Sequence, residues 1–272
     1  CTCLIKFSMG YGEFVKVVLF DGMNLIHRSR NSFSKGDHAL TYSFFRSFKP
    51  LIEKINPDVG YFVLEGRPKH RSQEYAGYKS NRPKQPDSFW RQQQEILSIM
   101  ESLPVSQARH PDFECDDVIA NMAKSNAAIG NEVVIVSGDS DFIQIFDHVS
   151  SERVSIYHPI KKTFIEKPLY NYLDWKSLRG DVSDNIPGIK GVGDKTATKI
   201  VNDPDFFREI LSNPEKRAIY ERNKRLIEFV WFDDTLVSQV EVKHPRLSIT
   251  EVKRCFTEMK FESMVSDKYW NK

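Results

Sequence analysis

The chain has 272 residues, a length that accommodates one large α/β domain or a core domain with a smaller appendage. Hydrophobic residues make up 40% and charged residues 28%, which excludes disordered, collagen-like and disulfide-scaffold proteins. No apolar run approaches the ~18 residues that a membrane span needs, and the net charge of +2 conceals a basic stretch from Arg67 to Arg91.

Strand and helix patterns alternate up to about residue 170. The apolar runs 14–20, 59–64 and 132–137 predict buried strands, and residues 153–157 and 163–166 predict a hairpin. Apolar residues at helical spacing predict helices over 40–55, 89–103 and 114–129. This alternation predicts an α/β fold with a mostly parallel central sheet and helices on both faces.

The patterns also divide the chain into three parts. An α/β core is expected over 11–170, and it contains an insertion within 66–110, where the stretch 67–87 is basic, aromatic and proline-rich. A small helical region is expected over 171–230. The segment 231–272 is expected to pack on the core, with a strand near 236–242 and a helix near 249–264.

The cysteines and the N-terminus bear on location. The four cysteines, at positions 1, 3, 115 and 255, lack metal-type spacing, which predicts reduced thiols and a cytoplasmic protein. The N-terminus lacks the pattern of a secretory signal. We expect Met9 to be the start, with residues 1–8 upstream or non-native.

Acidic residues follow the ends of three predicted strands, at Asp21, Glu65 and Asp139. The carboxyl ends of parallel strands meet at one edge of a sheet, so these side chains are expected to share a crevice. Asp141 faces the same way as Asp139 in an extended backbone. Further acids open a predicted helix or form a close pair, at Glu114, Asp116, Asp117, Asp181 and Asp184.

Such a cluster of carboxylates points to divalent cations. Two of them 4 Å apart repel by about 4 kcal/mol at an effective dielectric constant of 20, so the cluster stays ionised only beside cations. Oxygen ligands favour Mg²⁺ or Mn²⁺ over zinc. Two such ions about 3.5–4 Å apart would clamp the attacking and leaving oxygens of a phosphodiester. Each acid taken singly is equally consistent with a helix cap or a turn.

A glycine-rich turn between Asn185 and Ala197 precedes a short predicted helix. Its glycines free the backbone for tight turns and expose N–H groups near lysines, an arrangement that grips a nucleic-acid backbone without reading its sequence. An ordinary tight connection between two helices is the alternative. The residues concerned are Gly188, Lys190, Gly191, Gly193, Lys195 and Thr196.

Five strings in order resemble the 5′-nuclease, or flap endonuclease, family. They are residues 19–22, Arg71 with 75–82, 113–117, 137–141 and 180–197. The resemblance implies hydrolysis of DNA or RNA/DNA at 5′ ends and 5′ flaps, in replication or repair, with two Mg²⁺ or Mn²⁺ ions. The length is more similar to a stand-alone phage enzyme than to the 5′-nuclease domain of bacterial DNA polymerase I.

The resemblance also implies roles for individual residues. The first metal would be held by Asp21, Glu65, Glu114 and Asp116, and the second by Asp139, Asp141, Asp181 and Asp184, with Asp117 bridging or in an outer position. The basic stretch resembles the family's helical arch, where Lys79 and Arg82 would bind the scissile phosphate, Tyr78 would stack on a base, and Arg71 belongs to the catalytic set. The glycine-rich turn resembles a helix–three-turn–helix that grips duplex DNA and holds K⁺ on backbone carbonyls.

Glu65 departs from the family's pattern, which usually has aspartate there. The longer side chain is expected to remodel the first metal site or to favour Mn²⁺. One alternative is therefore a factor that binds branched nucleic acid but cuts it weakly, and another is a related single-strand ribonuclease. We expect a monomer that acts away from membranes and that replication proteins could recruit.

Overall fold

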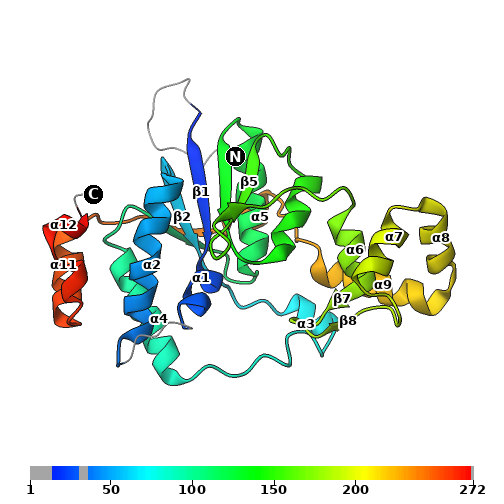
Figure 1. Cartoon of the computed structure of the whole chain (residues 1–272), viewed down its shortest axis with the longest axis horizontal. Helices are drawn as coiled ribbons and strands as arrows, with labels where there is room; N and C mark the ends of the chain where they lie inside the picture. Colours follow the sequence, from blue (N-terminus) through cyan, green and yellow to red (C-terminus); the bar gives the residue numbers. More distant parts are fainter. Residues whose placement is uncertain (1–13, 31–35, 271–272) are drawn as a thin grey trace.

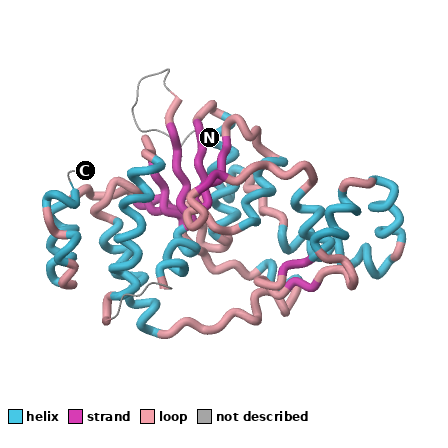
Figure 2. The backbone as a smooth tube through the Cα atoms, in the orientation of Figure 1, coloured by secondary structure: helices cyan, strands magenta, loops and turns pink. Residues whose placement is uncertain are grey.

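The structure is a computed structural model that describes residues 14–30 and 36–270. The expected start at Met9 lies outside the described residues. A seven-stranded sheet in the order β6-β5-β4-β1-β2-β3-β9 forms the centre of the molecule (Figure 2). Its strands are β1 (Lys16–Asp21), β2 (Val59–Val63), β3 (Ser106–Arg109), β4 (Glu132–Val136), β5 (Val154–His158), β6 (Thr163–Phe164) and β9 (Glu241–Lys243).

The five inner strands are parallel, and the edge strands β6 and β9 are antiparallel to their neighbours. Phe20 of β1 is in register with Phe62 of β2 and with Val136 of β4. The carboxyl ends of these three strands therefore lie at one edge, where a parallel sheet presents its ligand crevice. The predicted sheet and the predicted hairpin are both confirmed.

Helices cover both faces of the sheet, as predicted. Side chains alternate along β1, so that Val18 and Phe20 face one layer while Val17 and Leu19 face the other. The first layer consists of α1 (Gly22–Ser29), α2 (Ala39–Ile55), α4 (Asp87–Met100) and α11 (Ile249–Glu258). The second contains α5 (Cys115–Ala128) and the 3₁₀ helix η1 (Ser140–Asp147). Both cores are aliphatic and aromatic, which makes burial of the sheet the main source of stability.

A second, helical module lies between β6 and β9 in sequence and beside the sheet in space (Figure 1). Its own core includes Leu178, Ile189, Ile200 and Tyr220. Gly188 is required by packing, because a Cβ there would lie 1.9 Å from Arg179 O. Its elements are α6 (Tyr172–Arg179), β7 (Gly180–Asp181), β8 (Ile186–Pro187), α7 (Asp194–Val201), α8 (Pro204–Ser212) and α9 (Pro214–Ile227).

The insertion is shorter than the expected 66–110 and contains little helix. Between β2 and α4 the chain is fully described, and its only helix is α3 (His70–Glu74). Prolines 68, 83 and 86 disfavour a longer helix in this segment. Residues 87–109 belong to the core as α4 and β3. Strand β3 was not predicted, since Ser-Gln-Ala-Arg lacks an apolar run.

The C-terminal segment packs on the first layer through Val252 and Phe256 of α11. The strand expected near 236–242 is replaced by α10 (Asp234–Ser238), and only β9 is extended. The helix expected near 249–264 ends at Glu258, and η2 (Glu262–Met264) and α12 (Asp267–Trp270) follow.

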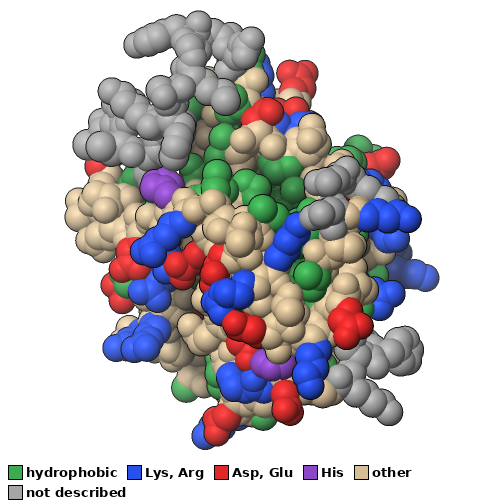
Figure 3. Space-filling view, turned by 90° about the vertical axis from the view of Figure 1, so that its left-hand side faces the viewer, with side chains coloured by type: hydrophobic (Ala, Val, Ile, Leu, Met, Phe, Trp, Pro, Cys, Tyr) green, Lys and Arg blue, Asp and Glu red, His purple; other side chains and the backbone are tan. Residues whose placement is uncertain are grey.

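Lys and Arg side chains are interspersed with Asp and Glu on this side of the molecule, as on a solvated surface (Figure 3). Among the described residues, no helix has both the length and the apolar character to cross a membrane.

Candidate active site

Asp21 and Asp139 are tied together at the carboxyl edge of the sheet. Asp21 ends β1, is buried, and accepts hydrogen bonds from the backbone N–H of Asn24 at 3.1 Å and from Ser137 Oγ at 2.7 Å. Ser137 Oγ in turn accepts from the backbone N–H of Asp139 at 3.0 Å. One serine hydroxyl thus links the acids that follow β1 and β4, which the register of the strands places side by side.

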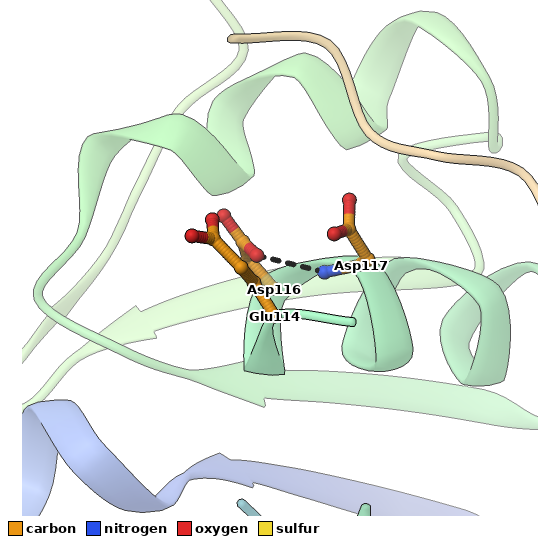
Figure 4. A group of neighbouring side chains, drawn as sticks. All are labelled: Glu114, Asp116 and Asp117. Carbon is orange, nitrogen blue, oxygen red and sulfur yellow. Dashed lines mark hydrogen bonds between the residues drawn. The ribbon is translucent and has the colours of Figure 1, made fainter. Parts of the chain in front are cut away.

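The start of α5 brings a second group of acids to this edge. One carboxylate oxygen from each of Glu114, Asp116 and Asp117 lies within 4.8 Å of the others. In Figure 4, Glu114 and Asp116 project together, while Asp117 projects apart from them and its backbone N–H bonds Asp116 Oδ1 at 2.9 Å. Glu65 Oε2 accepts from the backbone N–H of Cys115 at 3.1 Å. Glu65 therefore caps the helix that presents the acidic group, and its carboxylate lies within this site.

Residues 75–82, called the cationic loop here, place two cations against carboxylates from different elements. Lys79 Nζ lies 2.7 Å from Glu114 Oε1 and 3.9 Å from Asp184 Oδ2. Arg82 Nη2 lies 2.5 Å from Asp184 Oδ1. Both side chains retain exposure, 21% for Lys79 and 54% for Arg82. The loop therefore bridges the acids of α5 and those of the second module.

Arg71 lies deeper and is engaged through both of its terminal nitrogens, while its buried Nε has no hydrogen-bond partner among the described residues. It donates two parallel hydrogen bonds of 2.8 Å to the carboxylate oxygens of Asp117 and a third, also 2.8 Å, to Glu114 Oε2. Its side chain is only 2% exposed, and Asp117 Oδ1 also accepts from the backbone N–H of Val230 at 2.8 Å. Arg71 and Asp117 thus form a buried ion pair that fixes the start of α5, and the tight fork geometry suits arginine.

Tyr78 is also engaged within the protein. Its hydroxyl donates to Glu114 Oε2 at 3.0 Å, and its ring packs against a cluster of the second module that includes Ile186 and Ile227. The ring expected to stack on an unpaired base is, in this arrangement, an anchor for the cationic loop.

Lys176 is a site residue that sequence reasoning missed. Its ammonium contacts Asp141 and lies 2.6 Å from Asp181 Oδ2, and the residue is 3% exposed. On α6 it falls on the same buried face as Tyr172 and Leu173. A lysine among apolar residues of the predicted helical region was the signal that could have found it, because an isolated buried ammonium requires acidic partners.

The carboxylates carry more negative charge than the protein's own cations neutralise. Burial, together with neighbouring acids, raises the pKa of Asp21 to about 6, of Glu65 to about 7 and of Asp141 to about 7. Burial and the carboxylates of Asp117 and Glu114 also raise the pKa of Asp116. In Glu114, burial acts to raise the pKa, but Lys79 and Arg71 hold it below its usual value. The donor set is entirely oxygen and short of positive charge, which fits hard divalent cations.

The nine predicted acids thus form one connected neighbourhood. Asp139 acts electrostatically on both Asp21 and Asp141, Lys176 joins Asp141 to Asp181, and Lys79 joins Asp184 to Glu114. Glu65 links the first and last of these acids, since the negative charges of Glu114 and Asp21 both raise the pKa of its carboxyl.

The residues expected to grip a duplex lie apart from this neighbourhood, around the start of α7. Gly191 adopts a left-handed backbone with φ of +83°, and Gly193 is the residue before the helix. Of the six residues predicted to grip a duplex, Lys190, Gly191, Gly193 and Lys195 are exposed, whereas Thr196 and Gly188 are partly covered.

Comparisons with known proteins agree with this architecture. A profile of the 5′-3′ exonuclease N-terminal resolvase-like domain matches residues 16–171, and one of the 5′-3′ exonuclease C-terminal SAM fold matches residues 168–239. The thermostable DNA polymerase I of Thermus aquaticus is 30% identical over 76% of this chain, which spans 26% of that polymerase. The 5′-3′ exonuclease of Aquifex aeolicus is 30% identical over 92% of this chain and 93% of its own length.

A solved structure shares the fold. The bacteriophage T5 flap endonuclease, in a complex with DNA and metal ions, superposes with a TM-score of 0.59 at 18% identity. The match covers 78% of this chain and 86% of that one.

Proposed function

The chain belongs to the 5′-3′ exonuclease family, and from this premise we propose that it is a divalent-metal-dependent phosphodiesterase that removes 5′ ends and 5′ flaps from DNA. The observation that carries the proposal is the cationic loop, which lies between two groups of carboxylates, one led by Glu114 and the other by Asp184. A phosphate drawn to Lys79 and Arg82 would be held beside both groups.

The two groups would hold two ions, Mg²⁺ or Mn²⁺. Asp21, Glu65, Glu114 and Asp116 would serve the first, and Asp139, Asp141, Asp181 and Asp184 the second. When bound, such ions neutralise the clustered carboxylates and polarise the phosphate. Asp117 would act in an outer position, because both of its oxygens already accept from Arg71.

The chain's own cations have distinct tasks in this proposal. Lys79 and Arg82 would contact the phosphate and stabilise the charge that develops on its oxygens, since both are partly exposed at the mouth of the site. Arg71 and Tyr78 are positioning residues, which fix Glu114 and the cationic loop. Lys176 holds Asp141 and Asp181 together through contacts with both carboxyls.

The second module would bind the duplex next to the scissile phosphate. The Gly188–Thr196 turn offers exposed backbone and lysines, which suits contacts to phosphates and sugars rather than to bases. Several points stay predictions of the family resemblance. They are a K⁺ ion on the carbonyls of this turn, action on RNA 5′ strands in hybrids with DNA, a monomeric state and recruitment by replication proteins. A cytoplasmic location also stays a prediction.

The alternatives are not favoured. The extra methylene of Glu65 leaves its carboxylate at the start of α5, so a factor that only binds branched DNA has no support from that position. A single-strand ribonuclease is disfavoured by the helical module, for which it would have no evident use.

A labelled 5′-flap oligonucleotide tests the proposal. Short 5′ products are expected with Mg²⁺ or Mn²⁺ and none with EDTA. The matched variant Asp139→Asn should bind the flap but cut it several orders of magnitude more slowly, because it removes one oxygen ligand and preserves shape. Tight binding without metal-dependent product in the wild type would reject the proposed activity.

A further inference from the structure

The side-chain amide of Asn185 joins the two parts of the molecule. Its Nδ2 donates to Gly77 O at 2.8 Å and to Ser80 Oγ at 3.0 Å, both in the cationic loop. The backbone of Asn185 is left-handed, with φ of +57°. Asparagine and glycine both tolerate that conformation, but only asparagine supplies the donor. The left-handed backbone alone therefore does not explain why this residue is an asparagine.

Two further hydrogen bonds run between the same segments. The backbone N–H of Lys79 donates to Asp184 O at 2.9 Å, and Asn81 Nδ2 donates to Val182 O at 3.1 Å. Lys79 itself has a left-handed backbone, with φ of +53°, a conformation that costs a non-glycine residue about 1–2 kcal/mol. Such a conformation persists where neighbouring structure holds it, and here the support comes from the 181–187 turn.

Gly77 shows how closely the loop is folded. Its carbonyl accepts from Ser80 N at 3.1 Å and Ser80 Oγ at 2.9 Å as well as from Asn185. A Cβ on Gly77 would lie 2.5 Å from the ring of Tyr75, which itself packs on the second module beneath the Arg222 guanidinium, 4.9 Å away. Aromatic packing brings the loop to the module, and the Asn185 amide sets its position there.

The 181–187 turn runs directly into the glycine-rich turn, with Gly188 only three residues after Asn185. We propose that Asn185 is a positioning residue that couples the duplex-binding turn to the cationic loop and so sets where Lys79 and Arg82 lie relative to the carboxylates. The inference rests on the proposed function, because it assumes that the second module binds duplex and that Lys79 acts on the phosphate.

Asn185→Gly tests this coupling, because glycine keeps the left-handed backbone and removes only the amide. Single-turnover cleavage of a 5′-flap DNA at saturating Mg²⁺ should fall about 10- to 100-fold, as expected for a misplaced catalytic group. Flap affinity measured in Ca²⁺ should stay unchanged. Asn56→Gly is the matched control, since Asn56 is another left-handed asparagine, with φ of +51°, at the end of α2. Full cleavage by Asn185→Gly would overturn the proposal.

A double-mutant cycle separates positioning from general damage. In a Lys79→Ala/Arg82→Ala background, Asn185→Gly should add little further loss, because both groups that it positions are already gone. Fully additive losses would contradict the coupling. If the wild type itself fails to cut, the proposed activity is rejected, and the coupling is still decided by hydrogen exchange. A blunt duplex in Ca²⁺ should slow exchange in residues 75–82 of the wild type but not of Asn185→Gly, and equal slowing in both would overturn the coupling.

Discussion

Lys176 Nζ lies 2.6 Å from Asp181 Oδ2 and also contacts Asp141, so one buried ammonium bridges two carboxyls from different parts of the fold. Asp141 lies in η1, which follows β4, while Asp181 lies in β7, which follows α6. Burial acts to lower the pKa of Lys176, but Asp141 and Asp181 raise it well above its usual value. The lysine therefore stays charged and holds the second acidic group together.

Replacing Lys176 by methionine should make the fold depend on divalent metal. The change leaves two buried carboxylates without their cation, and breaking a buried pair costs about 3–5 kcal/mol. In EDTA, Lys176→Met should melt several degrees below the wild type, and Mg²⁺ should raise its Tm by more than it raises that of the wild type. Lys224→Met, at a half-exposed pair with Asp174, is the control. Equal Mg²⁺ responses in the two proteins would contradict this account.

Replacing Arg71 should lower the free energy of unfolding of the protein. Arg71→Met strips Asp117 and Glu114 of three hydrogen bonds in a buried setting, so the free energy of unfolding should fall by about 3–5 kcal/mol. Denaturant unfolding in EDTA measures it. Arg225→Met removes an exposed pair with Glu74 and should cost at most about 1 kcal/mol. A similar, small loss in both variants would show that the Arg71 pair is not structural.

Lys79 should matter more for cutting than for binding. Its ammonium is the closest cation to Glu114 at the mouth of the site, and loss of one group that stabilises developing charge costs about 10²–10³-fold in rate. Lys79→Ala should therefore slow single-turnover cleavage by that factor with little change in flap affinity. Lys84→Ala, an exposed lysine of the same segment, should weaken binding slightly and leave the rate intact. Parallel losses of binding and rate in Lys79→Ala would make it an anchoring charge only.

The stabilising effect of Mg²⁺ should grow with pH. The pKa values of Asp21, Glu65 and Asp141 are about 6, 7 and 7 in the fold, against ordinary values of 3.8, 4.5 and 3.8. Between these limits the folded chain binds more protons than the unfolded chain, so their contribution to stability falls as pH rises. A divalent ion reverses that loss once the carboxyls ionise. The Tm gained with Mg²⁺ over EDTA should be small near about pH 5 and large near about pH 8.

The difference between the Tm measured in Mg²⁺ and the Tm measured in EDTA, followed over pH, reports on the three carboxyls alone. Burial lowers the pKa of His27, His148 and His158, which acts in the opposite sense on stability, but it does so with and without Mg²⁺. Asp21→Asn should melt higher than the wild type in EDTA near about pH 8, because it removes a buried charge that has no cation. A Mg²⁺ effect that does not change with pH would contradict the assignment of these groups to the ion sites.

Local patterns in the sequence determined the α/β class, the parallel sheet and the position of Asp21, Glu65 and Asp139 at strand ends. They did so because apolar periodicity reports which face of a segment is buried, and parallel strands all end at one edge. The acids at the start of α5 followed for the same reason, since their spacing places them in one helical turn.

Only the tertiary structure decided which cations those acids meet. Arg71 contacts Asp117 across 46 positions, Lys176 reaches Asp141 across 35, and Asn185 reaches Gly77 across 108. No local pattern encodes such pairs, because each depends on how two separately folded segments pack. The same holds for the cationic loop, whose turns lack periodicity and are held in place by the second module.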